Sequence, residues 1–219
     1  MIDVTEEALV PQPGSSLVKA TEILSSEHRV IEQVLSCLEA MVRQARSTGG
    51  LDGQSAHDTL AFLRNFADHC HHGKEEDHLF PALEAEGLPR DGGPLGVMLY
   101  EHELGRAHLR GMDENLEAAA AGDAAALAEF VHRAEAYVAV LREHIHKEDH
   151  VLFPLADRSL GEEKQQRLLA EFRRVEAEEM GVGTHERYLQ IAQHLAQRYG
   201  VATAPTATPP GSGECGCGH

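Results

Sequence analysis

Two stretches of the chain carry the same arrangement of histidine and glutamate. One begins at His71 and the other at His144, and both end in Leu-Phe-Pro. Aligning the two Leu-Phe-Pro triplets places the two histidines over each other and Glu75 over Glu148, so each copy contains His-x-x-x-Glu. In a helix, residues i and i+4 lie on one face, so each copy presents an imidazole and a carboxylate together. This pairing is typical of a metal site.

A further histidine precedes each copy of the repeat. Glu27-His28 stands before the first copy and Glu101-His102 before the second. A lone inward histidine is usually a core residue, but four of them with two glutamates at the same offset favour a metal site over a structural polar network. Two buried ionised glutamates facing one core need cations between them, because removing a carboxylate from water is costly. The predicted metal-site residues are His28, His71, Glu75, His102, His144 and Glu148.

The type and number of these ligands indicate which metal they suit. Six or seven nitrogen and oxygen donors exceed a four-coordinate zinc site, and no thiolate belongs to the set. Imidazole with carboxylate suits iron or manganese, and shared carboxylates favour a dinuclear centre. His72 is the seventh candidate, because both His71 and His72 precede Glu75 by one helical turn. The donor set therefore predicts a dinuclear site for iron or manganese.

A second motif competes with this interpretation. Glu75-x-x-His78 and Glu143-x-x-His146 match the Glu-x-x-His of ferritin-like di-iron bundles. They stand at different offsets in the two copies, and the second pair lies beside basic residues, away from the apolar face. We therefore favour the first set. We expect Glu76 and Asp149 to orient ligands or face water. The other histidines are expected to be solvated or to support the ligands: His57, His69, His108, His132, His150, His185 and His194.

The segments between these motifs predict the helices that position them. Apolar side chains recur at helical spacing, and each of the four histidines lies on the apolar face of its segment. Helices of this length joined by short loops form an up-down-up-down four-helix bundle with inward-facing sites. The first two helices end near Arg46 and Glu86. Their predicted starts, in chain order, are a Ser15-Ser16 cap, a capping box from Ser55 to Asp58, Pro94 and an Asp123 cap.

We therefore predict an all-α protein in which a helical hairpin follows the four-helix bundle. A capping box at Ser159 begins a fifth helix that reaches about Met180, and a sixth ends near Tyr199. The four predicted parts are a flexible leader (1–16), the four-helix bundle (17–158), a C-terminal helical extension (159–200) and a disordered Gly/Pro/Cys tail (201–219).

The four cysteines do not form a disulfide framework. Cys37 and Cys70 lie in helical patterns and are expected to be small buried hydrophobic residues. Cys215 and Cys217, with His219, either bind a soft metal transiently or belong to a flexible tail with reactive thiols. A reducing compartment fits both interpretations.

Charge and composition exclude some partners. Nineteen lysines and arginines against thirty-six acidic residues give a net charge of −17, which repels nucleic acid and anionic membranes. No run approaches the roughly 20 apolar residues that a membrane span needs, and the acidic N-terminus does not resemble a signal peptide. We therefore expect a cytoplasmic protein without nucleic-acid or membrane partners.

The repeated pattern resembles that of the hemerythrin-like (HHE cation-binding) superfamily, in its bacterial cytoplasmic subset. That subset reads His, His-x-x-x-Glu, His, His-x-x-x-Glu, and the resemblance covers roughly residues 17–158. It implies a four-helix bundle holding a non-haem di-iron centre with two bridging carboxylates and an oxo or hydroxo bridge. The matching residues are Glu27-His28, His71 to Glu76 with Leu79-Phe80-Pro81, Glu101-His102, and His144 to Pro154.

The chain differs from the oxygen-carrying hemerythrins of marine invertebrates at two positions. Those have a second histidine four residues along helix three, where this chain has Arg106 after His102. Their last ligand is an aspartate five residues after its histidine, whereas Glu148 stands at four. His72 is expected to replace the missing histidine. These differences argue against reversible oxygen carriage and leave metal binding intact.

The resemblance also implies how the ligands are divided between two irons. An open position beside His28 and His71 is where dioxygen, peroxide or nitric oxide is expected to bind. The irons have separate histidines and shared glutamates: His28 and His71 for one, His72, His102 and His144 for the other, and Glu75 and Glu148 as bridges.

The expected function is binding of oxygen or a related small oxidant, with redox detoxification of peroxide or nitric oxide. The alternatives are a non-enzymatic module for oxygen or iron sensing, binding or storage, and a metal-free interaction bundle. No nucleophile–base pair or phosphate loop is present, so any enzymatic activity comes from the metals, and the electron donor is unknown. Residues that either line a pocket over the open position or form ordinary core are Phe62, Phe66, Leu99, Tyr100, Tyr137 and Leu141.

Overall fold

The computed structural model describes residues 18–179 and 183–204, and all regular structure in these ranges is helical. The all-α prediction is therefore confirmed for the described residues. Several helices contain π-helical segments, labelled η. The first four helical runs are α1 (Ala20–Thr48); α2 (Gly53–Phe62), η1 (Leu63–His72), η2 (Glu75–Leu79) and α3 (Phe80–Glu84); α4 (Gly93–Ala120); and α5 (Ala124–Lys147), η3 (Glu148–Leu152) and α6 (Phe153–Ser159).

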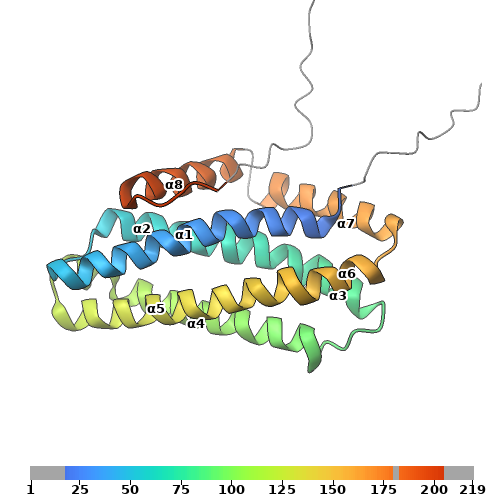
Figure 1. Ribbon diagram of the computed structural model, residues 1–219, viewed down its shortest axis with the longest axis horizontal. Helices are drawn as coiled ribbons and strands as arrows, with labels where there is room; N and C mark the ends of the chain where they lie inside the picture. Colours follow the sequence, from blue (N-terminus) through green and yellow to red (C-terminus); the bar gives the residue numbers. More distant parts are fainter. Residues whose placement is uncertain (1–17, 180–182, 205–219) are drawn as a thin grey trace, which may run out of the picture.

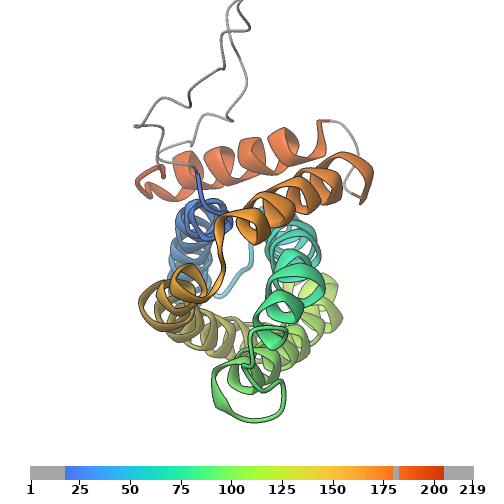
Figure 2. The same ribbon diagram turned by 90° about the vertical axis from the view of Figure 1, so that its right-hand side faces the viewer.

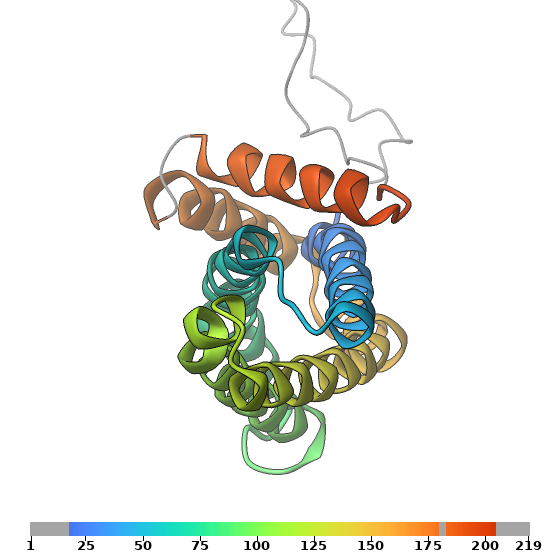
Figure 3. The same cartoon turned by 90° about the vertical axis from the view of Figure 1, so that its left-hand side faces the viewer.

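These four runs lie lengthwise beside one another around a common interior (Figures 1 and 2). The chain then continues into α7 (Glu162–Arg174), η4 (Val175–Glu179) and α8 (Thr184–Tyr199). We call residues 162–199 the C-terminal segment. Its helices cover the side of the molecule formed by α1 and the α2-to-α3 run (Figures 2 and 3). α8 contacts α1 and α2, while α7 contacts α1 and η2.

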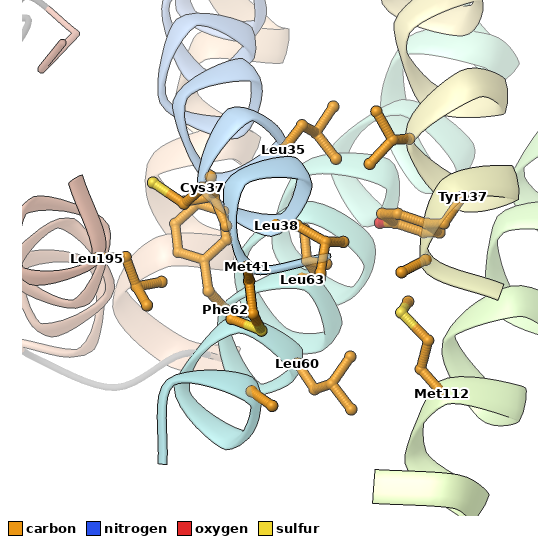
Figure 4. Close-up of a cluster of buried hydrophobic side chains, with 14 of the residues drawn as sticks. Leu35, Cys37, Leu38, Met41, Leu60, Phe62, Leu63, Met112, Tyr137 and Leu195 are labelled. Atoms are coloured by element: carbon orange, nitrogen blue, oxygen red, sulfur yellow. The ribbon is translucent and has the colours of Figure 1, made fainter. Parts of the chain in front are cut away.

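Two apolar clusters fill the interior. The larger includes Leu38 of α1, Phe62 of α2 and Tyr137 of α5, and Leu195 of α8 packs against it (Figure 4). The smaller includes Leu24, Phe80 and Phe172, which belong to α1, α3 and α7. Along each of the four long runs, the predicted metal-site residues fall between residues of these two clusters in the sequence. The polar site therefore lies in the middle of the molecule, closed by hydrophobic core on both sides.

The helix starts differ in part from the predictions. Asp123 caps α5 as predicted, and its carboxylate accepts hydrogen bonds from two backbone N–H groups. The cap of α2 is Asp52, whose carboxylate accepts from the backbone N–H of Ser55, so Ser55 lies inside the helix. The predicted cap at Ser55 is wrong because an aspartate three residues earlier takes that role. The predicted cap at Ser159 is wrong too, because this residue ends α6 and Gly161 precedes α7.

Other predictions fall partly outside the described residues. α1 begins at Ala20 after Lys19, and no side chain caps it, whereas the predicted Ser15-Ser16 cap lies outside the described residues. The leader (1–16) lies outside them as well, as does the tail from residue 205, including its cysteines. Cys37 and Cys70 are buried and unbridged, as predicted. No helix in the described ranges has the length and apolar character of a membrane span.

Candidate metal centre

π-helical turns stand at the points where the two repeats enter the core. η1 ends with His71 and His72, η2 begins at Glu75, and η3 begins at Glu148. A π-turn holds more residues than an α-turn, so successive side chains are separated by a smaller angle, and such turns often occur at functional sites. The wider turn lets both neighbouring histidines of η1 face inward. A uniform α-helix was expected here, because sequence periodicity does not reveal a single wide turn.

All seven predicted metal-site residues meet in the interior, and none is more than 3 % exposed. Their donor atoms form two groups, and within each group the atoms lie within 4.8 Å of one another. Glu75 belongs to both groups. The groups are His28, His71, Glu75 and Glu148, and His72, Glu75, His102 and His144.

Each glutamate lies between histidines from different groups. Glu148 Oε2 is 3.2 Å from the Nε2 atoms of both His28 and His144. Glu75 Oε1 is 3.7 Å from His71 Nε2, and its Oε2 is 3.5 Å from His102 Nε2. Both carboxylates therefore occupy bridging positions between the two groups.

Several of the inward atoms have no hydrogen-bond partner among the described residues. They include Nε2 of His28 and of His71, and all four carboxylate oxygens of Glu75 and Glu148. Buried polar groups are nearly always satisfied, and leaving one unpaired costs about 1–3 kcal/mol, more for a charged group. A structural polar network would pair these atoms with one another. Their chemistry instead fits cations placed between them.

The opposite nitrogen of every histidine faces a carboxylate. The Nδ1–carboxylate distances range from 2.6 Å for His102 to 3.3 Å for His72. A carboxylate accepts a hydrogen bond, so it holds the proton on Nδ1 and turns the Nε2 lone pair inward, which is the usual arrangement behind metal-binding histidines. We call these acceptors the outer carboxylates: Asp149 for His28, Glu27 for His71, Asp68 for His72, Glu76 for His102 and Glu101 for His144.

The outer carboxylates cross between the helices. Glu27 is the sequence neighbour of His28 in α1, but its carboxylate contacts His71 of η1. Glu101 likewise precedes His102 and contacts His144. Glu76 and Asp149, which we expected to orient ligands or face water, contact histidines. Asp68 was not predicted, although its position four residues before His72 is a helical spacing that could have indicated it.

Lysines and arginines form a further layer behind these acids. Lys74 contacts Glu27, Lys147 contacts Glu101, and Arg29 contacts Asp149. Arg106 donates to Asp68 at 2.8 Å and to Glu76 at 2.7 Å. Arg106 therefore supports the carboxylates behind His72 and His102 and supplies no ligand itself.

Phenylalanines of the Leu-Phe-Pro triplets pack on two of the histidines. Phe153 stacks on His28 with ring centroids 5.3 Å apart, and Phe80 stacks on His102 at 5.9 Å. His72 also stacks on His102, at 3.9 Å. These rings restrict the imidazoles and exclude water from one side of the site, which explains why the triplet recurs with the ligand motif.

Burial and mutual charge shift the titration of the inward groups. Burial together with the charge of Glu148 raises the pKa of Glu75 well above its ordinary value. Burial alone would lower the pKa of His28, but the Asp149 carboxylate bonded to Nδ1 and the nearby Glu148 carboxylate raise the pKa to about 9. Burial lowers the pKa of His71 to about 4. Without a metal, some of these groups therefore retain protons, and a bound cation would displace those protons.

The competing motif is not assembled. Glu143 and His146 are exposed and His78 is only partly buried, so the two Glu-x-x-His pairs do not meet in the core. None of the seven histidines that we expected to be solvated or supporting is buried: His57, His69, His108, His132, His150, His185 and His194.

The pocket-lining residues proposed from the sequence are mostly core. Phe62, Phe66, Tyr137 and Leu141 are buried in the larger apolar cluster, and Leu99 packs on the smaller one. Tyr100 is 68 % exposed, so its predicted place near the site is wrong, because the outer face of α4 carries it.

A cavity of about 280 Å³ lies on the outer side of the second group instead. Its lining includes Asp68 and Glu76, the carboxylates behind His72 and His102. The cavity therefore borders the carboxylates that support these two histidines, and not the histidines themselves. The complete lining is Asp68, His69, Gly73, Glu76, Asp77 and Arg106.

Helical scaffold and buried histidine–glutamate clusters together define a candidate cation-binding protein. The hemerythrin HHE cation-binding domain matches residues 19–156, and the chain belongs to this family. Uncharacterized proteins of Mycobacterium bovis and of two strains of Mycobacterium tuberculosis are 28% identical to it over 152 residues. That match covers 69% of this chain and 56% of each relative, so the chain spans little more than half of their length. No solved structure matches the chain significantly.

Proposed function

We propose that the chain binds two iron ions in an up-down-up-down four-helix bundle of hemerythrin type, to which α7 and α8 add a C-terminal hairpin. The observation that carries this proposal is the set of inward atoms without partners, above all the four carboxylate oxygens of Glu75 and Glu148. The proposed ligands are His28 and His71 for one ion, His72, His102 and His144 for the other, and Glu75 and Glu148 as bridges.

Iron is the proposed metal because of the donor set. Five imidazoles and two carboxylates exceed what a four-coordinate zinc site uses, and the described residues place no thiolate among them. Such a mixture suits iron, and carboxylates between two positions suit a di-iron pair with an oxo or hydroxo bridge. Manganese or zinc are possible substitutes, since ligand chemistry alone separates these ions weakly.

The proposed activity is redox detoxification of peroxide or nitric oxide. Bound iron would supply electrons to a small oxidant and would be restored by an electron donor that is still to be identified. The group containing His28 and His71 has fewer histidines than its neighbour, so we place the small ligand beside it. The chain itself orients the imidazoles through Glu27 and Asp149 and excludes water with Phe153.

Oxygen or iron sensing, binding or storage without turnover is the second candidate. One observation favours it: Lys74, next to Glu75, contacts Glu176 of the C-terminal segment at 2.5 Å. A change at the centre therefore has a direct contact through which it reaches a neighbouring element, as a sensor requires.

Metal analysis and optical spectra of anaerobically reduced protein test the proposal. We expect two irons per chain, lost in Glu75→Ala and Glu148→Ala and retained in the exposed control Glu143→Ala. Repeated consumption of peroxide or nitric oxide by the reduced protein would support detoxification. A stable and reversible oxygen spectrum without turnover would support the binding role instead. Absence of stoichiometric metal would refute both.

A further inference from the structure

The repeat places a lysine at the same position in each half of the site. Lys74 precedes Glu75, and Lys147 precedes Glu148. Each ammonium contacts the outer carboxylate that fixes the histidine one turn earlier: Glu27 behind His71, and Glu101 behind His144.

The two lysines differ in what covers them. The side chain of Lys74 is 0 % exposed, whereas that of Lys147 is 38 % exposed. Within the described part of the chain, Lys147 forms its ion pair with Glu101 alone. Lys74 has a second carboxylate, because Glu176 of η4 lies 2.5 Å from its ammonium. The C-terminal segment therefore seals one half of the site and leaves the other open.

Other contacts hold the same lysine against this segment. Its ammonium lies 5.7 Å from the ring centroid of Phe172 in α7. Glu27, Glu176 and His185 bring ligand-type atoms within 4.8 Å of one another, which resembles a further cation site. Lys74 contacts two of these three residues at 2.5 Å, so the ammonium already supplies the positive charge there. A buried ammonium between two carboxylates is fixed in place, because removing one partner leaves an uncompensated charge.

We propose that Lys74 and Glu176 are positioning residues through which the C-terminal segment fixes the Glu27–His71 pair and strengthens metal binding at the position containing His28 and His71. The inference rests on the proposed metal site. It means that the C-terminal segment strengthens one metal position and leaves the other unaffected. Residues behind metal ligands commonly change metal affinity by about 10- to 100-fold when altered, and loss of the Glu176 contact should have an effect at the lower end of this range.

Cobalt(II) titration of the metal-free full-length chain, followed by optical spectra, tests the inference. The variants are Glu176→Gln and Glu176→Ala, and the matched controls make the same changes at Glu163, an exposed glutamate of α7 paired with Arg167. We expect about 10-fold weaker cobalt binding at one of the two positions in the Glu176 variants only. The metal-free Glu176 variants should still unfold cooperatively, because Lys74 keeps Glu27 as a partner, but at a lower temperature than the controls.

Proton NMR of the cobalt-loaded protein identifies the position. The exchangeable Nδ1–H signals of His71 and His144 are assigned through their loss in His71→Gln and His144→Gln. In the Glu176 variants, we expect faster solvent exchange of the His71 proton and no change at His144. Lys147→Met should do the reverse, because it removes the cation behind Glu101.

Two outcomes would overturn the inference while leaving the metal site in place. One is cobalt binding by the Glu176 variants that equals that of the Glu163 controls at both positions. The other is equal weakening at both positions, which would reveal a general effect on the fold. If the wild-type chain binds no stoichiometric cobalt or iron, the proposed function fails as well.

Discussion

His102 and His144 point their Nε2 atoms at each other across 3.0 Å. Nδ1 of each ring faces a carboxylate, Glu76 for the first and Glu101 for the second. With the protons held on Nδ1, two lone pairs oppose each other in a buried space, and such a contact repels unless a positive charge lies between them. The pair therefore shows within a single contact why the interior suits a cation.

Metal removal should destabilise the fold. A ligand that binds only the folded state at 100 times its Kd adds about 2.7 kcal/mol of stability. We expect the melting temperature to fall when a chelator removes the metal and to recover when iron(II) is returned. Differential scanning calorimetry measures this change. An unchanged melting temperature in the chelated, verified metal-free protein would argue against a metal between these histidines.

Metal affinity should rise with pH. The pKa of His28 is about 9 in the metal-free fold, above its ordinary value, so its protonated form stabilises the fold below pH 6.5 and this contribution is lost as the pH rises through 9. A metal must displace this proton, so binding to the folded chain strengthens as the pH rises towards about 9 and levels off above it. Competition titrations with a coloured chelator check the trend. Asp149→Asn removes one cause of the shift and should flatten the dependence.

Removing an outer carboxylate should weaken binding without unfolding the chain. Glu101→Gln leaves the His144 Nδ1–H with a poorer acceptor, and we expect about 10- to 100-fold lower metal affinity. Isothermal titration with cobalt(II) measures the loss. Glu114→Gln, on the exposed surface of the same helix, is the control and should bind as the wild type does.

Arg106→His should not restore the ligand of the oxygen carriers. His72 already stacks on His102 at 3.9 Å, and the arginine contacts Asp68 and Glu76 behind them. We expect an unchanged number of bound irons with modestly weaker binding, whereas His72→Gln should lose a ligand and alter the optical spectrum. A new histidine ligand in the Arg106 variant, detected by spectroscopy of 15N-histidine-labelled protein, would contradict the assignment of His72.

Core truncation away from the site should separate stability from metal binding. Phe62 is fully buried and stacks on Phe66 with ring centroids 4.8 Å apart. Phe62→Ala should lower the free energy of unfolding by about 3–5 kcal/mol. Urea denaturation measures the loss, and metal analysis below the transition should still find the wild-type stoichiometry. Loss of metal in the folded variant would show that the core also controls the site.

Residue type and spacing were enough to predict which side chains gather in the core. The seven site residues follow from two repeats, because helical periodicity directs His71 and Glu75 to one face. The contacts between helices, such as Glu27 with His71, could not be predicted because they join residues 44 positions apart in sequence. The wide turns of η1 to η3 were missed for a different reason: a single π-turn leaves the apolar period almost unchanged.

The burial of Lys74 could not be predicted either, because it also depends on contacts between helices. A lysine inside a motif of charged residues is expected to lie on the solvated surface, since lysine is rarely buried. Lys74 pairs with Glu176, which belongs to the helical hairpin, and sequence analysis predicted that hairpin without predicting its contacts with the bundle. Helix caps were predicted correctly at Asp123 and wrongly at Ser55, because Asp52 competes for the same helix start.

The crossed placement of the outer carboxylates makes the halves of the chain dependent on each other. His28 relies on Asp149 from the second half, and His102 relies on Glu76 from the first, so neither helix pair contains a finished coordination sphere. A fragment ending in the loop before α4 would carry His28 without its supporting carboxylate, because Asp149 lies in the second half. Complete assembly of the centre therefore requires that both helix pairs have docked, and tight binding of an ion indicates that they have.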